Sequence, residues 1–165
     1  MTLYILKGFH YSTFLPRIYK KKKSFTKTCQ VKFDESCKYQ IEEQSCVNKL
    51  WGFSNGLFDI HKDSWRFGWT YNKEEDKIIL WSYIYHRGKL TKKPIYKIDF
   101  NEHILQLQLT NLSDKYIIRF IVDGQIVAEY TIDSLVLNSL IELGFYFGGK
   151  TRAPHNMNIK FKRIK

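Results

Sequence analysis

The residues most suited to chemistry lie between positions 59 and 87. Asp59, His61 and Asp63 alternate in a predicted loop, and this spacing could present two carboxylates and an imidazole to one cation. Ca²⁺ takes about six to eight oxygen ligands, and the loop lacks the glycine spacing of an EF-hand. We therefore predict a solvated loop here, with no metal and no cofactor.

No set of residues in the sequence predicts catalysis. Glycoside hydrolysis needs two carboxylates about 5–10 Å apart, and no predicted strand carries the alternating acidic pattern of many sandwich glycosidases. A serine nucleophile elbow, a phosphate-binding glycine loop and a zinc-binding H-E-x-x-H helix are also missing from the sequence. We therefore expect a protein that binds or assembles and not an enzyme.

Aromatic side chains dominate two predicted strands, residues 65–71 and 77–87. Side chains alternate between the two faces of a strand, so each strand divides into two sets. The first strand places four aromatic residues on one face: Trp65, Phe67, Trp69 and Tyr71. The second strand places a largely aromatic set on one face and a mainly aliphatic set on the other; the aromatic set is Ile79, Trp81, Tyr83 and Tyr85.

The loop of residues 72–76 permits two registers for this hairpin. A slip of one residue exchanges the faces that meet. If Trp69 lies opposite Leu80, the outer face carries a cationic and aromatic platform that could stack on sugar rings or dock a protein: Arg66, Trp81, Tyr83 and Tyr85. If Trp69 lies opposite Ile79, the aromatic residues pack together and no platform forms. Core packing is the simpler interpretation, because large aromatic residues fill cores more often than they form platforms.

The charge of the chain is concentrated at its two ends. The 165 residues include 27 Lys and Arg against 16 Asp and Glu, a net charge of +11. Residues 1–33 carry +8, residues 34–150 carry −2, and residues 151–165 carry +5. Basic runs are usually solvated, but they also bind phosphates or acidic proteins. The residues predicted to contact an acidic partner are Lys20, Lys21, Lys22, Lys23, Lys160, Lys162 and Arg163. First and last strands often pair, so we expect the two basic ends to form one patch. We also expect the fold to stay largely intact when these ends are removed.

The elements that must position these residues are almost all strands. Leu105, Leu107 and Leu109 alternate with polar residues, and Asp123-Gly124 predicts a tight turn between strands 116–122 and 125–132. Further strands are expected at residues 3–9, 28–33, 37–43, 94–100, 143–148 and 157–164, and a short helix or irregular crossing at 134–142. This pattern predicts an all-β protein, an antiparallel two-sheet sandwich of the jelly-roll or concanavalin (lectin)-like class. We expect one domain over residues 1–165, with the basic segment 1–33 partly an arm.

The three cysteines and the apolar runs bear on location. Cys29, Cys37 and Cys46 are odd in number and include no C-x-x-C pair, which favours reduced, buried thiols over zinc or redox chemistry. No apolar run approaches the roughly 18–20 residues that span a bilayer, and no signal-peptide core is present. We expect a cytoplasmic protein, or one incorporated into a virion, that does not bind membranes.

Three motifs carry a resemblance to known proteins. They are Asn48-Lys49-Leu50-Trp51-Gly52-Phe53-Ser54, Ser64-Trp65-Arg66-Phe67-Gly68-Trp69, and Tyr146-Phe147-Gly148-Gly149 with Ala153-Pro154-His155. From Asn48 onward the sequence resembles short proteins of gut Bacteroidota and of the crAss-like phages that infect them. The group has no settled activity, so the resemblance implies a genomic context and no catalytic residues.

These observations leave three hypotheses for function. The first is a phage structural or virion-assembly protein that docks on other subunits or on copies of itself. The second is a lectin-like carbohydrate-binding module that uses the platform of the 65–87 hairpin. The third is a regulator that binds nucleic acid through its basic ends, although residues 34–150 are slightly acidic.

Overall fold

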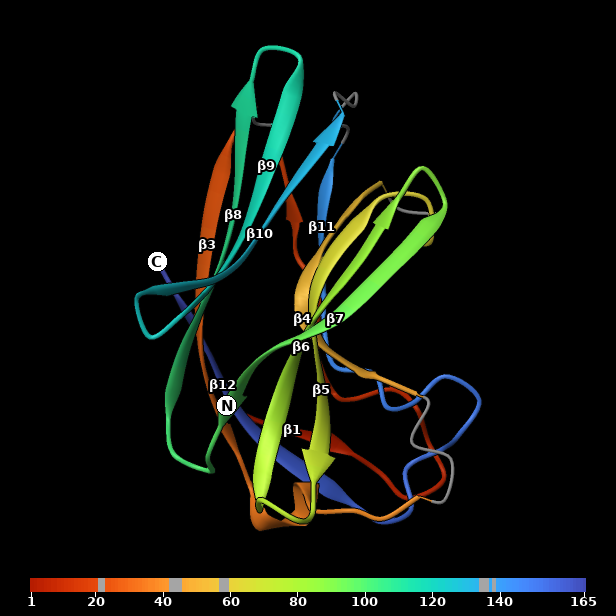
Figure 1. Cartoon of the computed structure of the whole chain (residues 1–165). Helices are drawn as coiled ribbons and strands as arrows, with labels where there is room; N and C mark the ends of the chain where they lie inside the picture. The colour runs from red at the N-terminus through yellow and green to blue at the C-terminus, as the bar shows by residue number, and fades with distance from the viewer. Residues whose placement is uncertain (21–22, 42–45, 57–59, 134–136, 138) are drawn as a thin grey trace.

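Two six-stranded antiparallel sheets face each other in the computed structural model (Figure 1). The structure describes residues 1–20, 23–41, 46–56, 60–133, 137 and 139–165. In spatial order, the first sheet consists of β1 (Thr2–Ile5), β12 (Met157–Ile164), β3 (Phe25–Phe33), β8 (His103–Leu112), β9 (Lys115–Val122) and β10 (Gln125–Asp133). The second consists of β2 (Ile18–Tyr19), β11 (Leu140–Leu143), β4 (Asn48–Asn55), β5 (Ser64–Asn72), β6 (Lys77–His86) and β7 (Lys89–Ile98).

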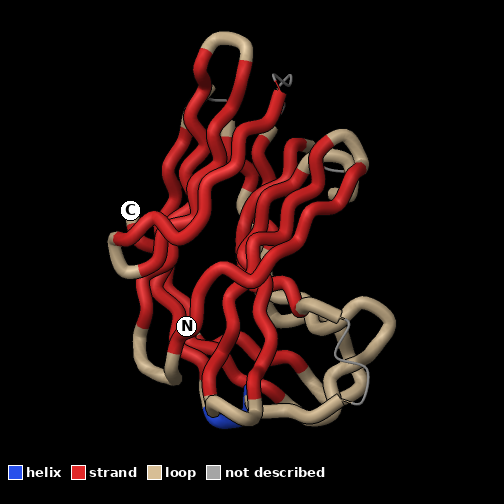
Figure 2. Tube along the Cα trace, in the orientation of Figure 1, coloured by secondary structure: helices blue, strands red, loops and turns tan. Residues whose placement is uncertain are grey.

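The all-β antiparallel sandwich predicted from the period-two pattern is confirmed. Figure 2 shows strands throughout the described chain and a single short helical turn, the 3₁₀ helix Glu35–Cys37. Aromatic residues fill the space between the sheets: Trp51, Trp65, Trp69, Phe33, Phe53, Phe67, Phe120, Phe147 and Phe161 are almost completely buried. Their rings meet edge to face, as Phe67 and Phe120 do across the two sheets at 4.9 Å.

The register of the β5–β6 hairpin is the one that produces an outer platform. Trp69 lies opposite Leu80, so Trp65, Phe67 and Trp69 face the core together with the aliphatic set of β6. The turn is fixed locally, because the Asn72 side chain accepts hydrogen bonds from the backbone N–H groups of Glu74 and Glu75. The predicted Asp123-Gly124 turn is also confirmed, and both residues have the positive φ that such turns need, 49° and 83°.

Three expectations about local structure are wrong. The strand β11 (Leu140–Leu143) overlaps the stretch 134–142 that was expected to be helical or irregular, and it pairs with both β2 and β4; residues 134–136 and 138 lie outside the described residues. In place of a strand at 37–43, Asp34 caps the 3₁₀ helix by accepting a hydrogen bond from Ser36, and residues 38–41 are not strand. The strand expected at 143–148 does not form: Leu143 ends β11, and residues beyond it make only isolated bridges, those of Tyr146 with Tyr11 and Lys49.

The strand β4 was not among the expected strands, for a physical reason. A bulge between Lys49 and Trp51 interrupts the alternation on which the prediction depended. Most of the strand is also buried on both faces, because segments 6–17 and 144–156 lie beside the lower part of the second sheet (Figure 1). Such a strand shows no polar side in its sequence.

Both ends of the chain contribute strands to the first sheet, β1 at its edge and β12 next to β1. β1 pairs with β12, as expected for first and last strands, and β12 pairs in turn with β3. The parts of segment 1–33 that form β1 and β3 are therefore not an arm. Removal of both ends would also take β3 and β12, two interior strands, out of the sheet.

A buried ion pair joins the two sheets. Glu142 on β11 is 1% exposed and accepts hydrogen bonds from Arg163 Nε of β12 at 2.8 and 3.0 Å. Trp51 Nε1 donates a third at 2.8 Å, and Arg163 Nη2 also donates to the Leu15 carbonyl at 2.7 Å. The two charged groups therefore compensate each other inside the protein.

The edge strand β7 is rich in lysine. It carries Lys89, Lys92, Lys93 and Lys97 together with Pro94, which has no backbone N–H to donate. Among the cysteines, Cys29 and Cys37 are buried, as expected, and Cys46 is half-buried. In the described part of the chain, no helix has the length and apolar character needed to cross a membrane.

Candidate functional site

The outer face of the second sheet brings together the four residues of the predicted platform. The register places Arg66 opposite Tyr83, Gly68 opposite Trp81 and Ser64 opposite Tyr85. Trp81 and Tyr85 are half-buried, whereas Arg66 and Tyr83 are only 5% and 7% exposed. The four residues share a face, but they do not form the flat, open platform that we expected.

Two segments distant in the sequence cover part of this face. Residues 11–16 and 143–146 rise beside Arg66 and, with Ile60, enclose a hollow of about 190 Å³. We call it the Arg66 hollow. Its described lining is otherwise aromatic, aliphatic or small: Tyr11, Ser12, Phe14, Pro16, Ile60, Leu143, Gly144, Phe145 and Tyr146. Arg66 is the only charged residue in this lining.

Arg66 is buried without an anionic partner among the described residues. Its Nε atom has no hydrogen-bond partner, and no described carboxylate forms an ion pair with it. The ring of Tyr83, 5.2 Å from the guanidinium carbon, supplies the nearest favourable contact. Burial lowers the pKa of Arg66, which remains charged at neutral pH because guanidinium pKa values start above 12. Ser64 Oγ, on the same face of β5, is likewise buried and unpartnered.

The neighbouring strand makes room for this arginine. Gly52 of β4 lies directly opposite Arg66. A Cβ atom at Gly52 would overlap the Trp65 carbonyl oxygen and the Cα and Cγ atoms of Arg66. The glycine therefore lets β4 and the aliphatic stem of Arg66 approach closely.

Lys49 adds a second positive charge next to the hollow. Its Nζ atom lies 5.0 Å from the ring centre of Tyr83 and 5.5 Å from that of Tyr146, and donates a hydrogen bond to the Gly148 carbonyl at 2.9 Å. Burial, assisted by the charge of Arg66, lowers the pKa of Lys49 to about 8. The two cations thus raise the local potential in a poorly solvated place.

Aromatic rings continue on both sides of the cations. On one side, His61 stacks on Tyr85 at 5.0 Å, and Tyr85 meets Tyr83 at 5.8 Å. On the other side, Tyr146 meets Tyr11 edge to face at 5.1 Å. The rings provide faces and edges that could pack against the C–H surface of a sugar.

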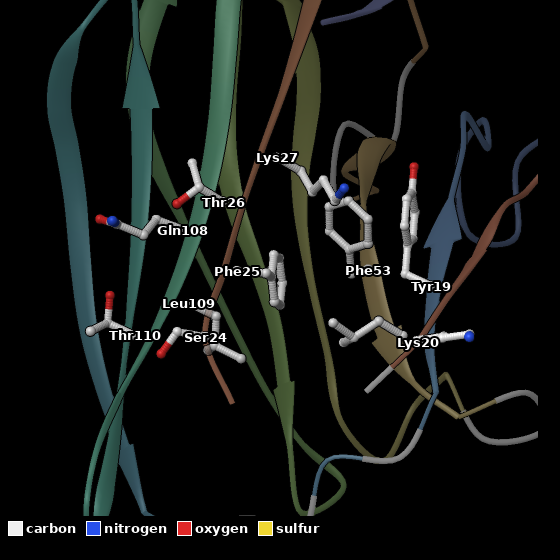
Figure 3. Close-up of a pocket in the computed structure, with 11 residues that line it drawn as sticks. Tyr19, Lys20, Ser24, Phe25, Thr26, Lys27, Phe53, Gln108, Leu109 and Thr110 are labelled. Atoms are coloured by element: carbon white, nitrogen blue, oxygen red, sulfur yellow. The ribbon is translucent and has the colours of Figure 1, made fainter. Parts of the chain in front are cut away.

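A larger hollow lies between the two sheets, at the end where β3 and β8 face β2, β4 and β11. Its volume is about 390 Å³. Figure 3 shows Tyr19 and Phe53 on one side, Gln108 and Thr110 on the other, and Phe25 between them. Lys27 Nζ lies 4.1 Å from the ring centre of Tyr19. Its described lining contains no buried side-chain polar atom without a partner.

The described residues of the predicted basic contact set lie in different surroundings. Lys20 lines the inter-sheet hollow and Lys23 is exposed, while Lys21 and Lys22 lie outside the described residues. Lys160 and Lys162 are exposed on the first sheet, where Lys160 lies opposite Lys32. Arg163 is not available to an outside partner, because the carboxylate of Glu142 binds it internally.

The two described residues of the predicted Asp-x-His-x-Asp set, His61 and Asp63, contact other groups. Asp63 accepts hydrogen bonds from the backbone N–H of Arg87, and its Oδ1 contacts His86 Nδ1 at 3.1 Å. His61 stacks on Tyr85, and Asp59 lies outside the described residues. Among the residues that the structure describes, no group of three or more His, Cys, Asp or Glu side chains could hold a metal ion.

The sequence reasoning missed Lys49, Tyr146, Tyr11 and Phe14. Contacts far apart in sequence bring them to the site: the Lys49 backbone pairs with Tyr146, and Gly148 N–H donates to Asn48 Oδ1 at 2.6 Å. The motifs that carry the sequence resemblance are thus neighbours in space.

Comparisons with known proteins bear on the fold. No protein-family model matches the chain, and none of the curated proteins matches its sequence. A functionally unknown protein from Saccharomyces cerevisiae has a similar structure, with a TM-score of 0.55, 12% identity, and coverage of 99% of this chain and 86% of that one. A glycosyl hydrolase family protein from Mycobacterium fortuitum has a TM-score of 0.50, 12% identity, and coverage of 90% and 66%. A carbohydrate-binding module from Bacillus subtilis gives 0.38, 12%, and 98% and 78%. At 12% identity, the likeness to the first two structures is one of fold alone.

Proposed function

We propose that this protein is a non-catalytic carbohydrate-binding protein whose site is the outer face of the second sheet. One observation carries the proposal. The β5–β6 register places Trp81, Tyr83 and Tyr85 on the same face as a buried arginine that lacks an anionic partner in the described structure. Aromatic faces with a few well-placed polar groups are the usual composition of a small-molecule site.

Binding without hydrolysis follows from the side chains at the face. A glycosidase needs two carboxylates flanking the bond that it cleaves. The described residues lining the Arg66 hollow include no Asp or Glu, and Glu142 is held by Arg163 in the interior. Incubation with bound oligosaccharides should therefore release no reducing ends.

Intrinsic fluorescence gives a selective test of glycan binding. Of the four tryptophans, Trp51, Trp65 and Trp69 are at most 1% exposed, and only Trp81 reaches the outer face in a half-buried position. A glycan array would identify a ligand, and titration with that ligand should change the emission of Trp81. The change should disappear in Trp81→Phe while calorimetry still detects binding.

Substitutions separate binding from folding. Trp81→Ala and Tyr85→Ala should weaken glycan binding by about tenfold, which corresponds to the loss of a moderate aromatic anchor. Tyr4→Ala is the matched control, since Tyr4 is a half-exposed aromatic residue on the other sheet. If the array shows no ligand, or if Tyr4→Ala weakens binding as much as Trp81→Ala, the proposed site is wrong.

A second candidate function, a virion-assembly subunit, is favoured by the exposed apolar residues of the N-terminal segment. Seven large hydrophobic residues among the first 18 are exposed: Met1, Tyr4, Leu6, Phe9, Tyr11, Leu15 and Ile18. Gathered apolar exposure marks protein interfaces more often than free surface. Under this proposal the protein co-purifies with phage particles in fixed copy number, and its absence from purified particles would exclude the role.

A further inference from the structure

We infer that the Arg66 hollow selects a sugar that bears a carboxylate, with the Arg66 guanidinium as the group that recognises the acid. This inference rests on the proposed glycan binding and names its ligand class. Arg66 is 5% exposed, lines the hollow, and has an unpartnered Nε atom. A buried charge without a partner is costly to the folded protein, and an incoming anion would remove that cost.

The charge around the hollow favours an anion over a neutral ligand. The described lining supplies no carboxylate to compete for Arg66, and Lys49 places a second ammonium beyond Tyr83 and Tyr146. Charges in a poorly solvated place interact more strongly than charges in water. A neutral sugar would leave both cations without compensation.

The shape of the guanidinium favours a carboxylate. Nε and the adjacent Nη of an arginine lie in one plane and donate two parallel hydrogen bonds, which match the two oxygens of a carboxylate. Nε of Arg66 is buried and has no partner in the described structure, so it is the donor that a carboxylate would satisfy.

The walls of the hollow favour a single sugar ring. Its volume of about 190 Å³ is below the roughly 300–1,000 Å³ of pockets for drug-sized ligands. Tyr11, Phe14 and Tyr146 line it with aromatic surface, which packs on C–H groups and not on a fully hydrated ion. A ring with one apolar face and one carboxylate satisfies both parts of the site.

Matched pairs of ligands test the inference directly. The probes are oligosaccharides of galacturonate, glucuronate and mannuronate, each compared with its methyl ester, which keeps the ring and removes the charge. Calorimetry at neutral pH and low salt should show at least one acid bound about tenfold or more tightly than its ester, as expected for hydrogen bonds between charged groups. Acetate should bind far more weakly than the uronate.

Two arginine variants link the preference to one residue. Arg66→Met should abolish the difference between acid and ester, and Arg66→Lys should reduce it, because an ammonium keeps the charge but loses the planar fork. Arg119→Met is the control, since Arg119 pairs with Glu129 at 2.6 Å on the first sheet, and it should leave the preference unchanged. Circular dichroism would verify that each variant is folded.

The outcomes distinguish this inference from the function on which it rests. If glycans bind, depend on Trp81, and show no difference between acid and ester, the acid preference is wrong and the proposed function stands. If no glycan binds, both are wrong. Acetate binding as tightly as the uronates, or a sulfated sugar binding while no uronate does, would also overturn the inference. Equal acid preference in Arg66→Met and the unaltered protein would remove Arg66 from the role.

Discussion

Two arginines in this protein occupy opposite surroundings. Arg163 lies between the sheets, where Glu142 binds its Nε at 2.8 and 3.0 Å and a backbone carbonyl accepts from its Nη2. Arg66 lies on the outer face of the second sheet and is at least as well covered, yet its Nε has no partner and its nearest contact is an aromatic ring. The first cation is satisfied within the fold. The second cation, Arg66, has no anionic partner in the described structure.

The two hollows differ in the same way, in whether the buried polar groups of their lining have partners. The inter-sheet hollow is about twice as large, 390 Å³ against 190 Å³, but its described lining leaves no buried polar atom unsatisfied. Size alone would favour the inter-sheet hollow. The unpaired charge favours the smaller one, because a binding site is preorganised for an interaction that is missing in the free protein.

Breaking the ion pair between Glu142 and Arg163 should have the largest effect on the free energy of unfolding. Glu142→Ala leaves Arg163 and Trp51 Nε1 without their acceptor inside the sandwich. We expect the free energy of unfolding to fall by about 3–5 kcal/mol, the usual cost of stranding one member of a buried ion pair. Urea denaturation measures the change. Glu129→Ala, which removes the acid from an exposed pair with Arg119, should cost about 1 kcal/mol or less, and an equal loss would contradict the distinction.

Adding a methyl group at Gly52, opposite Arg66, should have the next largest effect on stability. Gly52→Ala places a methyl group against the Trp65 carbonyl and the stem of Arg66. We expect a loss of about 1–3 kcal/mol in stability, as for overpacked cores, together with weaker binding of the ligand at the hollow. Gly88→Ala is the control. Gly88 has a φ of 80° with open space around it, so this substitution strains the backbone without placing a methyl group against Arg66. If Gly52→Ala binds and unfolds like the unaltered protein, Gly52 does not position Arg66.

Replacing Arg66 itself should have little or no cost to folding. Arg66→Met removes an unpaired buried charge and loses only the contact with Tyr83, worth about 0.5–1 kcal/mol. The free energy of unfolding should stay unchanged or rise by up to about 2 kcal/mol, while binding of the acidic ligand is lost. Thermal denaturation without ligand measures the first effect. A large destabilisation would show that Arg66 serves the fold and not a ligand.

The smallest expected effect is a pH dependence from Lys49. Its pKa of about 8 means that the ammonium loses its charge as the pH rises through 8, so affinity for an anion should fall by about two- to fivefold between pH 7 and pH 9. The stability of the free protein should change in the opposite direction. The pKa in the folded protein lies below the ordinary lysine value of 10.5, so Lys49 makes the free energy of unfolding increase with pH between about 8 and 10.5.

Controls assign this pH dependence to one group. The charges that act on Lys49 come from Arg66, Lys92 and Cys46, and the Tyr83 ring lies against it. Burial raises the pKa of Tyr83 to about 12, so it does not titrate in this range. Thiols do titrate near pH 8–9, so the measurement belongs in a Cys46→Ser background. If the loss of affinity persists in Lys49→Met, another group is responsible.

The fold class was predictable from local patterns because strands and tight turns are local. Leu105, Leu107 and Leu109 alternate as expected, and all three are buried in β8. The register of the aromatic hairpin was not predictable, since the 72–76 loop is compatible with two pairings. Burial of three aromatic residues of β5 against the opposite sheet selects one of them.

The site was predictable only in part, for a related reason. Alternation within β5 and β6 placed Arg66, Trp81, Tyr83 and Tyr85 on one face without any knowledge of the rest of the fold. The burial of Arg66 depends on residues 11–16 and 143–146, which no local pattern connects to it. Its isolation from acids is a property of the assembled tertiary structure.

The lysines of β7 give part of the basic composition a structural role. An open sheet edge offers unpaired backbone groups to any passing strand, and charged side chains and proline prevent such pairing. β7 carries four lysines and Pro94 along the open edge of the second sheet, next to the strand that presents Trp81 and Tyr85. The charge and the proline of this edge therefore disfavour strand pairing between copies of the protein beside the half-buried aromatic residues of β6.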